Sequence, residues 1–427
     1  MNSLPVRRWW YIIPVAVVMY MMAYMDRINV SMILPYIDDS FHITSSAAGF
    51  ASGIFFVGYM ILQIPGGYLA SRWSARKVVF ILMILWGLSA MATGLVKTPT
   101  QLYLARFVLG VFEGGVWPAV LVLLASWFAN DERARANALW MTCLPISAVI
   151  MAPLTGWLLT FLNWRDIFII EGAPPIIWAF VWWFTVTDKP QSARWLTESE
   201  KAATTRVLAA ENETKPNDAG LRAALTNKTV WWLIAGYFFW MSGFYGFSLW
   251  EPSVVKSFQG IASSGTVGLL SAVPFFFAFL SMIVTSYLSD KTGKRRLFVA
   301  LPLVVGTIGL VAGQLLGHGP MISMVFLVIA AIGVYGPYGP FWAIPSRILR
   351  IEVVGAAMGI INAIGNLGGF LGPYLVGYLK QVTHSSFVGF YVLAAFLVIA
   401  ILISSLLKSE TETNRGFIPA SGQPTQF

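Results

Sequence analysis

The sequence has few of the residues that metal and redox chemistry requires. It contains one cysteine, Cys143, and three histidines in 427 residues. A single cysteine excludes a disulfide framework and a thiolate metal cluster. The histidines show no metal-ligand spacing, and no phosphate-binding loop leads into Lys-Ser or Lys-Thr. We therefore expect neither a metal site nor a cofactor, and neither a membrane enzyme nor an ATP-driven pump.

Charged residues are also scarce. They form 11% of the chain, and hydrophobic residues form 57%, whereas a soluble domain is roughly 25% charged. Segments of about 20 apolar residues are long enough to cross a bilayer, and the segments here exceed the roughly ten residues of barrel strands. We predict an all-α polytopic membrane protein with 12 transmembrane helices. The predicted spans are 9–34, 46–70, 78–96, 101–128, 135–162, 166–187, 229–250, 265–288, 296–316, 321–346, 353–379 and 387–407.

The basic residues are distributed unevenly among the loops. If the N-terminus is cytoplasmic and the spans alternate, 22 of the 28 fall on the cytoplasmic side and 4 on the other, while Arg27 and Arg106 lie within spans. This is the positive-inside pattern of an even number of spans. Both termini are therefore expected to be cytoplasmic. The net charge of +9 reflects topology, so we expect membrane lipid around the protein and no nucleic-acid partner.

A polar segment with two prolines and one glycine divides the spans into six and six. It contains Glu198, Glu200, Lys201 and Arg206, a pattern that predicts a short amphipathic helix on the membrane surface. The predicted organisation is an N-terminal six-helix bundle at 1–187, a cytoplasmic central loop at 188–228, a C-terminal six-helix bundle at 229–407 and a cytoplasmic tail at 408–427.

The two halves carry related sequence patterns. Residues 67–77 correspond to 286–296, and residues 153–156 correspond to 373–377, at offsets between 219 and 221 residues. Internal repeats at matching positions of two hydrophobic halves are typical of transporters, in which a site lies between the halves near the midplane. The repeats predict two bundles related by pseudo-symmetry.

The segments 67–77 and 286–296 are predicted to be loops between spans. They resemble the signature between the second and third helices of the major facilitator superfamily and its counterpart in the second half. The second copy keeps Asp290 and Gly293, whereas the first has Ser71 and Ser74 where the family has Asp and Gly. The resemblance implies structural and electrostatic roles for Asp290, Arg72 and Arg106. In the family, the acidic residue of the first loop stabilises the outward-open state. Because Ser71 replaces it here, the resemblance also implies that the N-terminal half stabilises this state less strongly.

Five further motifs occur in order along the chain. They are Tyr24-Met-Asp26-Arg27-Ile-Asn29, Gln63-Ile-Pro65-Gly66-Gly67, Glu113, Trp164-Arg165-Asp166 with Glu171-Gly172, and Asn362-Ala-Ile-Gly-Asn366. These motifs resemble those of the anion:cation symporters of this superfamily, which carry organic acids with protons or sodium. Carriers of sugar acids and of aromatic acids resemble the chain about equally. One departure is Glu251, at a position where an apolar residue is expected.

Four charged residues lie within the predicted first and fourth spans: Asp26, Arg27, Arg106 and Glu113. Burying such a group costs at least a few kcal/mol, so each marks a pathway, a proton relay or a structural ion pair. We expect Asp26 to pair with Arg106, and Arg27 and Glu113 to face a central cavity. A guanidinium binds a carboxylate bidentately and stays charged, so Arg27 is the expected substrate ligand. Glu113, with Asp26, is the expected proton carrier; the alternative for both acids is a purely structural role.

Further polar and aromatic side chains within the spans are expected to contact the substrate. Hydroxyl and amide groups suit a polyhydroxylated acid, and aromatic faces also suit a ring. Resemblance to sugar-acid carriers supports Tyr59 and Asn362, whereas packing is the alternative role of Tyr245 and Trp342. The complete set is Tyr24, Tyr59, Tyr245, Trp342, Ser346 and Asn362, with Asn366 as a further candidate.

Together these features predict proton-coupled symport of a small organic anion by alternating access. A sugar acid is the first candidate substrate, and a monomer in a bacterial inner membrane is expected. An aromatic or sulfonated acid is the alternative substrate. An organophosphate or anion exchanger would need cations from both halves, and none lies deep in span seven. A membrane sensor without turnover is the remaining alternative.

Overall fold

The computed structural model describes residues 5–213, 220–258, 263–317, 319–349 and 351–406; the predicted tail at 408–427 lies outside this part. The described residues are helical and contain no strand, which confirms the predicted fold class. The elements are α1 (Arg7–Phe41), α2 (Ser45–Ile61), α3 (Gln63–Leu69), a π-helical turn η1 (Ala70–Ser74), α4 (Ala75–Gly94), α5 (Pro99–Gly114), α6 (Val116–Trp127), α7 (Asn130–Met141), α8 (Cys143–Leu158), α9 (Trp164–Thr185), a short 3-10 turn η2 (Pro190–Ser192), α10 (Glu198–Glu213), α11 (Gly220–Thr226), α12 (Lys228–Lys256), α13 (Ser264–Thr292), α14 (Arg295–Leu316), α15 (Pro320–Tyr335), α16 (Tyr338–Ala343), α17 (Pro345–Ile348), α18 (Ile351–Gly365), α19 (Gly368–Thr383) and α20 (Ser386–Leu406).

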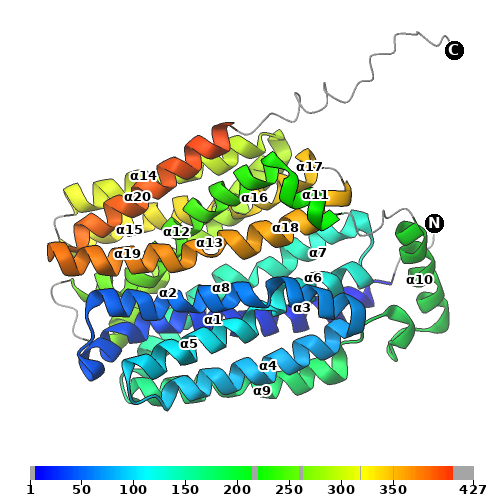
Figure 1. Ribbon diagram of the computed structural model, residues 1–427, viewed down its shortest axis with the longest axis horizontal. Helices are drawn as coiled ribbons and strands as arrows, with labels where there is room; N and C mark the ends of the chain where they lie inside the picture. Colours follow the sequence, from blue (N-terminus) through cyan, green and yellow to red (C-terminus); the bar gives the residue numbers. More distant parts are fainter. Residues whose placement is uncertain (1–4, 214–219, 259–262, 318, 350, 407–427) are drawn as a thin grey trace, which may run out of the picture.

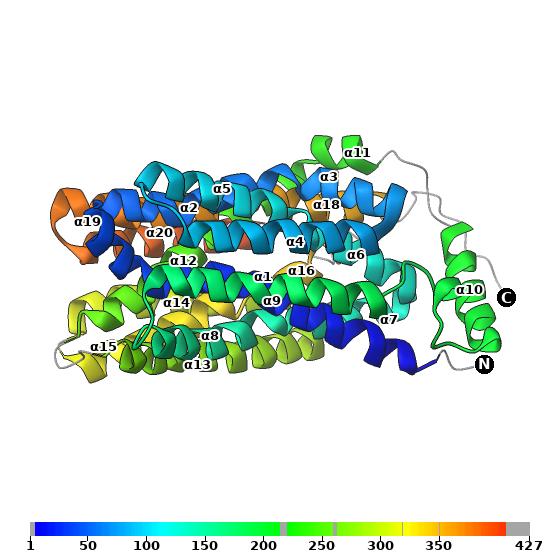
Figure 2. The same cartoon turned by 90° about the horizontal axis from the view of Figure 1, so that it is seen from below.

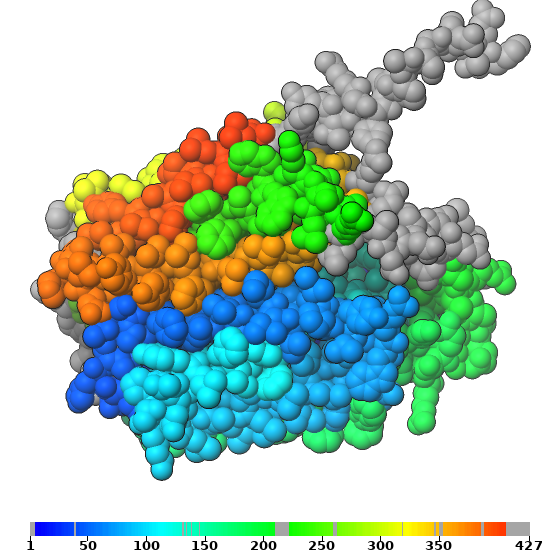
Figure 3. Space-filling model, viewed as in Figure 1, coloured from blue at the N-terminus to red at the C-terminus, as the bar shows by residue number. Residues whose placement is uncertain are grey.

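The axes of the long helices are roughly aligned, and the helices form two groups (Figures 1 and 2). Helices α1–α9 make up one group and α12–α20 the other, and the space-filling view shows the two meeting along a seam between α2 and α19 (Figure 3). The beginning of α1 and helix α10 lie at one end of the molecule. We call this the Ser74 end, after the turn between η1 and α4, and the opposite end, where α2 begins, the Ser45 end.

Most of the long helical runs are suited to a membrane. Ten runs in the described residues are long and apolar enough to cross one. One of these, Ser45–Gly94, has 50 residues; about 20 suffice for a crossing, and the chain reverses at Ser74, so this run makes two passes. With α12, which has 29 residues, the runs account for the twelve predicted passes.

Several passes that the sequence predicted as continuous are interrupted near their middle. Gly115 separates α5 from α6, Gly336 and Pro337 separate α15 from α16, and Asn366 and Leu367 separate α18 from α19. Glycine and proline weaken a helix because of backbone freedom and a missing N–H. Such breaks are tolerated at membrane depth where the backbone is buried in protein, and they cluster around the sites of transporters.

The two repeated loops make their turns differently. Gly293 ends α13 with a left-handed backbone (φ 69°), which explains a glycine there. Ser74 instead has an extended backbone and caps α4, accepting a hydrogen bond from the Lys77 N–H at 3.0 Å. Asp188 completes this cap, because its carboxylate accepts from the Ser74 hydroxyl at 2.6 Å and from the Arg76 N–H at 2.9 Å. The Gly-to-Ser departure in the first loop therefore has a local structural reason.

Glycines bring α5 against α2 and so position the buried acid of α5. A Cβ atom on Gly110 would collide with the Phe55 carbonyl oxygen, and one on Gly114 with the Tyr59 carbonyl oxygen. The backbones therefore touch at two successive turns of α5. This contact holds Glu113 beside Tyr59, as close packing of small residues does in membrane helices generally.

We expect Gly114→Ala to destabilise the protein. Alanine is normally the better helix former, but here its methyl group would overlap the α2 backbone, and overpacking costs about 1–3 kcal/mol. Thermal unfolding of the purified protein in detergent should show a lower midpoint. Gly359→Ala in α18 is the matched control, because nothing lies within 4 Å of its added methyl group. Equal midpoints for the two variants would contradict the close approach.

Candidate functional site

The centre of the site is an ion pair between α1 and α5. The Arg27 guanidinium donates two hydrogen bonds to one oxygen of Glu113, from Nε at 2.6 Å and from Nη2. Both side chains are buried, with 5% and 0% of their surface exposed. The second carboxylate oxygen of Glu113, Oε2, has no hydrogen-bond partner. Glu113 therefore neutralises the charge of Arg27, and its second oxygen remains free to accept a proton.

Aromatic side chains enclose the guanidinium group of Arg27. Its central carbon lies 4.5 Å from the ring centroid of Tyr59, and the rings of Tyr20, Tyr24 and Phe55 lie between 5.4 and 5.8 Å away. These distances are within the range of cation–π attraction. Four rings with three hydroxyl groups thus form a polar aromatic cage around one cation.

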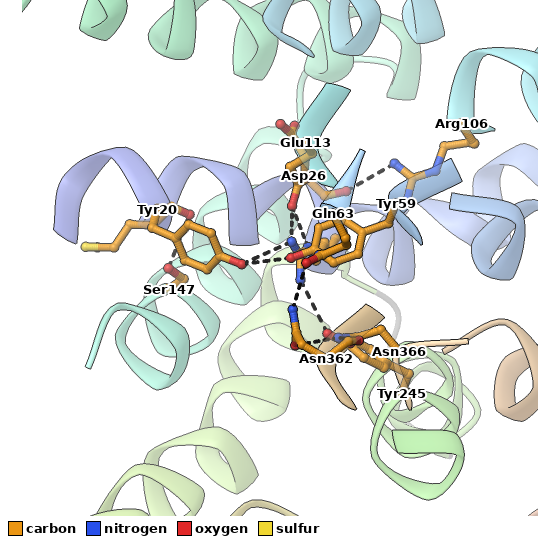
Figure 4. A network of polar contacts seen from close by, with 12 residues as sticks. Tyr20, Asp26, Tyr59, Gln63, Arg106, Glu113, Ser147, Tyr245, Asn362 and Asn366 are labelled. Atoms are coloured by element: carbon orange, nitrogen blue, oxygen red, sulfur yellow. Dashed lines mark hydrogen bonds and ion pairs between the residues drawn. The ribbon is translucent and has the colours of Figure 1, made fainter. Parts of the chain in front are cut away.

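The cage extends into the second half of the protein. Arg27 Nη1 donates to the Tyr245 hydroxyl of α12 at 3.4 Å, and the Tyr245 ring packs on Phe56 of α2 at 4.1 Å. Arg27 Nη2 also donates to the Tyr20 hydroxyl at 3.4 Å, which lies 3.2 Å from the Tyr59 hydroxyl. The guanidinium group consequently contacts both groups of helices at once; Figure 4 shows Tyr20, Tyr59 and Tyr245 in this network.

A second polar contact joins the two halves beside this cage. The Asn362 amide of α18 donates to the Gln63 side-chain oxygen at 3.1 Å, and the Asn366 amide donates to the Asn362 side-chain oxygen at 2.8 Å. All three residues are buried. The Gln63 amide nitrogen has no partner, so this row of amides retains an unused donor near Tyr59 (Figure 4).

The predicted carboxylate pair between Asp26 and Arg106 is wrong. Arg106 Nη1 donates to the main-chain carbonyl of Asp26 at 3.1 Å, and Asp26 Oδ2 has no hydrogen-bond partner. The two residues do lie at the same depth, since the Arg106 side chain contacts the Asp26 backbone. The long arginine side chain reaches the backbone of α1, and no hydrogen bond joins it to the aspartate side chain. Arg106 thus ties α5 to α1 without neutralising Asp26 through a hydrogen bond.

The structure adds a contact between Arg27 and Glu113 that was not predicted. We expected both to face a central cavity, and that expectation stays a prediction. In the structure they bind each other, because the long arginine side chain extends from α1 to the carboxylate on α5. The depth of a residue along its helix does not determine where its charged group lies, so the depths of Arg27 and Glu113 could not predict their contact.

Another buried acid connects three helices of the first half. Glu171 of α9 accepts hydrogen bonds from the Asn29 amide of α1 at 2.5 Å and from the Thr155 hydroxyl of α8 at 3.1 Å. Both carboxylate oxygens are used, so this acid has a packing role in the bundle. Among the described residues, no group of three or more His, Cys, Asp or Glu side chains could hold a metal ion.

The remaining candidates lie outside the cage. Trp342 of α16 packs edge-on against Tyr237 at 5.2 Å, and its indole nitrogen is buried without a partner. Asp290, in the last turn of α13, pairs at 3.2 Å with Arg295, the first residue of α14. Arg72 is exposed at the Ser74 end and lies over the Tyr68 ring at 5.8 Å. The side chain of Ser346 is outside the described part of the chain.

Two residues of the site were missed as substrate or coupling candidates. Tyr20 lies seven residues before Arg27, which places both on one face of α1; that spacing was a usable signal. Gln63 is a polar residue in an apolar run and forms part of a motif already noted. Its contact with Asn362, from the other half, was not visible in the sequence.

The halves are packed tightly at the Ser45 end. A Cβ atom on Gly49 of α2 would lie 2.5 Å from the Pro373 carbonyl oxygen of α19. On the other side of the molecule, one on Gly156 of α8 would lie 2.7 Å from the Ser264 carbonyl oxygen of α13. Two backbone-to-backbone seams therefore close the site from the Ser45 end.

The sequence matches a family model described as the Major Facilitator Superfamily, over residues 16–373 and again over 262–426. It is 32% identical to a putative tartrate transporter of Agrobacterium vitis, over 95% of this chain and 94% of that protein. It is 25% identical to the D-galactonate transporter of Escherichia coli O6:H1 (strain CFT073), over 88% and 90% of the two chains. These relatives confirm the resemblance to organic-acid carriers.

A solved structure has the same fold. It is the inward-open conformation of the xylose transporter XylE from E. coli, with a TM-score of 0.76, 15% identity, and 95% of this chain and 99% of that chain covered. The fold, the family match and the relatives agree with the twelve passes and the site buried between two groups of helices. The chain is therefore a member of the major facilitator superfamily, whose members are membrane transporters rather than enzymes.

Proposed function

We propose that the protein is a proton-coupled symporter of a small organic anion, with a sugar acid such as tartrate as the first candidate substrate. One observation carries this proposal: the buried guanidinium of Arg27 is bound by Glu113, whose other oxygen is free. A substrate carboxylate that binds Arg27 must compete with Glu113 for the same donors. Protonation of Glu113 removes that competitor, so proton and anion binding favour each other.

The surroundings of Arg27 support a carboxylate substrate. Arg27 Nη1 and Nη2 contact only neutral hydroxyl groups besides Glu113, and both can turn to a carboxylate in the bidentate geometry that arginine prefers. The Gln63 amide, with its unused N–H, and the tyrosine hydroxyls of the cage suit the hydroxyl groups of a sugar acid. The name of the tartrate relative supports the same class of substrate.

The same contacts explain why Arg27 can link binding to movement. The guanidinium and its aromatic cage involve both groups of helices, through Tyr245 on α12. We propose that the bundles at 1–187 and 229–407 rock around this site, with the Ser45 end facing outward and both termini in the cytoplasm of a bacterium. A ligand can shift such an equilibrium only by binding one state more tightly than the other.

The cage also favours a second candidate substrate class. Four aromatic rings around Arg27 would stack against the ring of an aromatic acid. An organophosphate exchanger is disfavoured, because the other deep guanidinium, Arg106, is directed at the α1 backbone. Transport measured with acids of both classes decides between them.

The test is transport by the purified full-length protein in liposomes that contain a pH-sensitive dye. Tartrate, galactonate, an aromatic acid and a sulfonated acid are offered outside, with the membrane potential held at zero. We expect the transported acid to carry protons inward, and a gradient of one pH unit to sustain about tenfold accumulation per coupled proton, since one unit equals about 1.36 kcal/mol. Uptake of every acid without proton movement, or uptake that requires sodium, would refute the proposal.

A further inference from the structure

The C-terminal half contains a buried acid for which the proposed mechanism has no role. Glu251 of α12 has none of its surface exposed, and neither carboxylate oxygen has a hydrogen-bond partner. A polar side chain of α13 faces it: Ser271 is also fully buried, and its hydroxyl also lacks a hydrogen-bond partner. Three unpartnered polar atoms therefore meet at one place between two helices.

No basic group neutralises this acid in the described part of the chain. Lys256, on the same helix, lies over the Tyr36 ring of α1 at 4.3 Å, and Lys380 of α19 lies over the Trp250 ring at 5.1 Å. Neither forms an ion pair with Glu251. Helices α13 and α20 bring no charged side chain to this end. An ionised carboxylate without a counter-ion is strongly disfavoured in such surroundings, and the neutral acid is the form that fits.

Hydroxyl groups lead from this acid towards the cage. The Tyr335 hydroxyl of α15 lies 3.0 Å from that of Ser248, one turn before Glu251 on α12. Tyr335 is an electrostatic neighbour of both Glu251 and Tyr24, and the Tyr24 ring lies 5.8 Å from the Arg27 guanidinium. Ser248, Tyr335 and Tyr24 therefore supply hydroxyl groups between Glu251 and the central site.

The position of Glu251 places it near the end that opens outward in the proposed cycle. It lies five residues before the end of α12 at Lys256, whose contact with Tyr36 joins α12 to α1. Pro252 follows directly inside the helix and removes the backbone hydrogen bond to the Ser248 carbonyl, so α12 can bend beside the acid. Separation of α1 from α12 and of α8 from α13 would bring water to this face.

We propose that Glu251 is a second proton-binding site of the carrier, which takes up a proton when the Ser45 end is open and keeps it until the Ser74 end opens. The proton binds a carboxylate oxygen of Glu251, no covalent bond of the protein breaks, and the proton then leaves towards the central site and the cytoplasm along the hydroxyl groups of Ser248 and Tyr335. This inference rests on the proposed function, because it adds a proton to the coupled transport. Its role differs from that of Glu113, because Glu251 has no arginine to release.

The protonation state can be measured without a substrate. Infrared difference spectra of the purified protein at neutral pH should contain a carboxylic-acid carbonyl band that Glu251→Gln removes. Glu198→Gln is the matched control, because Glu198 is 88% exposed and pairs with Lys201, so it contributes a carboxylate and not an acid band. An unchanged acid band in Glu251→Gln would overturn the proposal. Glu251→Met, also neutral, serves if the glutamine variant does not purify.

Transport in liposomes supplies the second test, with tartrate as the probe and the pH-sensitive dye inside. The ratio of protons to tartrate should be lower in Glu251→Gln than in the wild-type protein and unchanged in Glu198→Gln. A wild-type ratio in Glu251→Gln, or a dependence on sodium at constant pH, would overturn the second site alone. If the wild-type protein carries tartrate without protons, the proposed function itself fails. If tartrate is not carried, the infrared result alone decides whether Glu251 holds a proton.

Discussion

Glu113→Gln is expected to abolish uphill accumulation of substrate while one-for-one exchange persists. Glutamine has nearly the shape of glutamate but cannot take up a proton, and it cannot hold Arg27 with a negative charge. The guanidinium group then becomes available to the substrate at every pH, so anion binding should no longer depend on protons. Liposomes loaded with substrate measure the exchange, and an inward pH gradient measures accumulation.

The same variant should also lose stability in the absence of substrate. Removing one partner of a buried ion pair leaves the other charge uncompensated and costs about 3–5 kcal/mol. A bound substrate carboxylate would supply a new counter-ion, so the substrate should raise the unfolding midpoint more in the variant than in the wild-type protein. Accumulation at the wild-type level in Glu113→Gln would reject the coupling role of this residue.

Arg27→Lys is expected to weaken substrate binding by about tenfold to a hundredfold. Lysine keeps the charge but replaces the planar guanidinium fork with a single ammonium group, so bidentate binding of a carboxylate is lost. A hydrogen bond to a charged group contributes about 1.5–3 kcal/mol, and about 1.4 kcal/mol corresponds to a factor of ten. Titration of the purified protein by calorimetry measures the change in dissociation constant.

Arg106→Lys is the control for this substitution. Arg106 is equally buried, but it donates to the main-chain carbonyl of Asp26 rather than to a carboxylate. We expect this variant to lower stability with little change in substrate affinity. If the two lysine variants lost the same affinity, then Arg27 would have no special role in binding, and the observed loss would reflect distortion of the first half.

Much of the fold could be predicted from the sequence, for a physical reason. The bilayer requires about 20 apolar residues per crossing, so each span leaves a continuous mark on the sequence. The distribution of basic residues and the repeated loops then gave the even number of spans and the internal symmetry. The breaks at Gly115 and at Asn366 were not predicted, because an apolar run looks the same whether its helix is continuous or interrupted.

The composition of the site could be predicted in part. Arg27 and Glu113 stood out because charge is costly within a span, and Tyr59 and Asn362 were selected by resemblance. The partners of these residues could not be predicted, since a side chain several ångströms long can reach different groups from the same depth. Arg106 reaches a backbone carbonyl rather than the Asp26 carboxylate, which no one-dimensional pattern distinguishes.

By itself, the sequence determined that the chain spans a membrane repeatedly in two related halves and that α1 and α5 bury charges. Those properties depend on local apolarity and periodicity. Only the tertiary structure decided that Arg27 is bound by Glu113, that Gln63 meets Asn362 across the halves, and that Glu251 is buried without a partner. Such contacts join residues from 86 to 299 positions apart, so they exist only after the helices have packed.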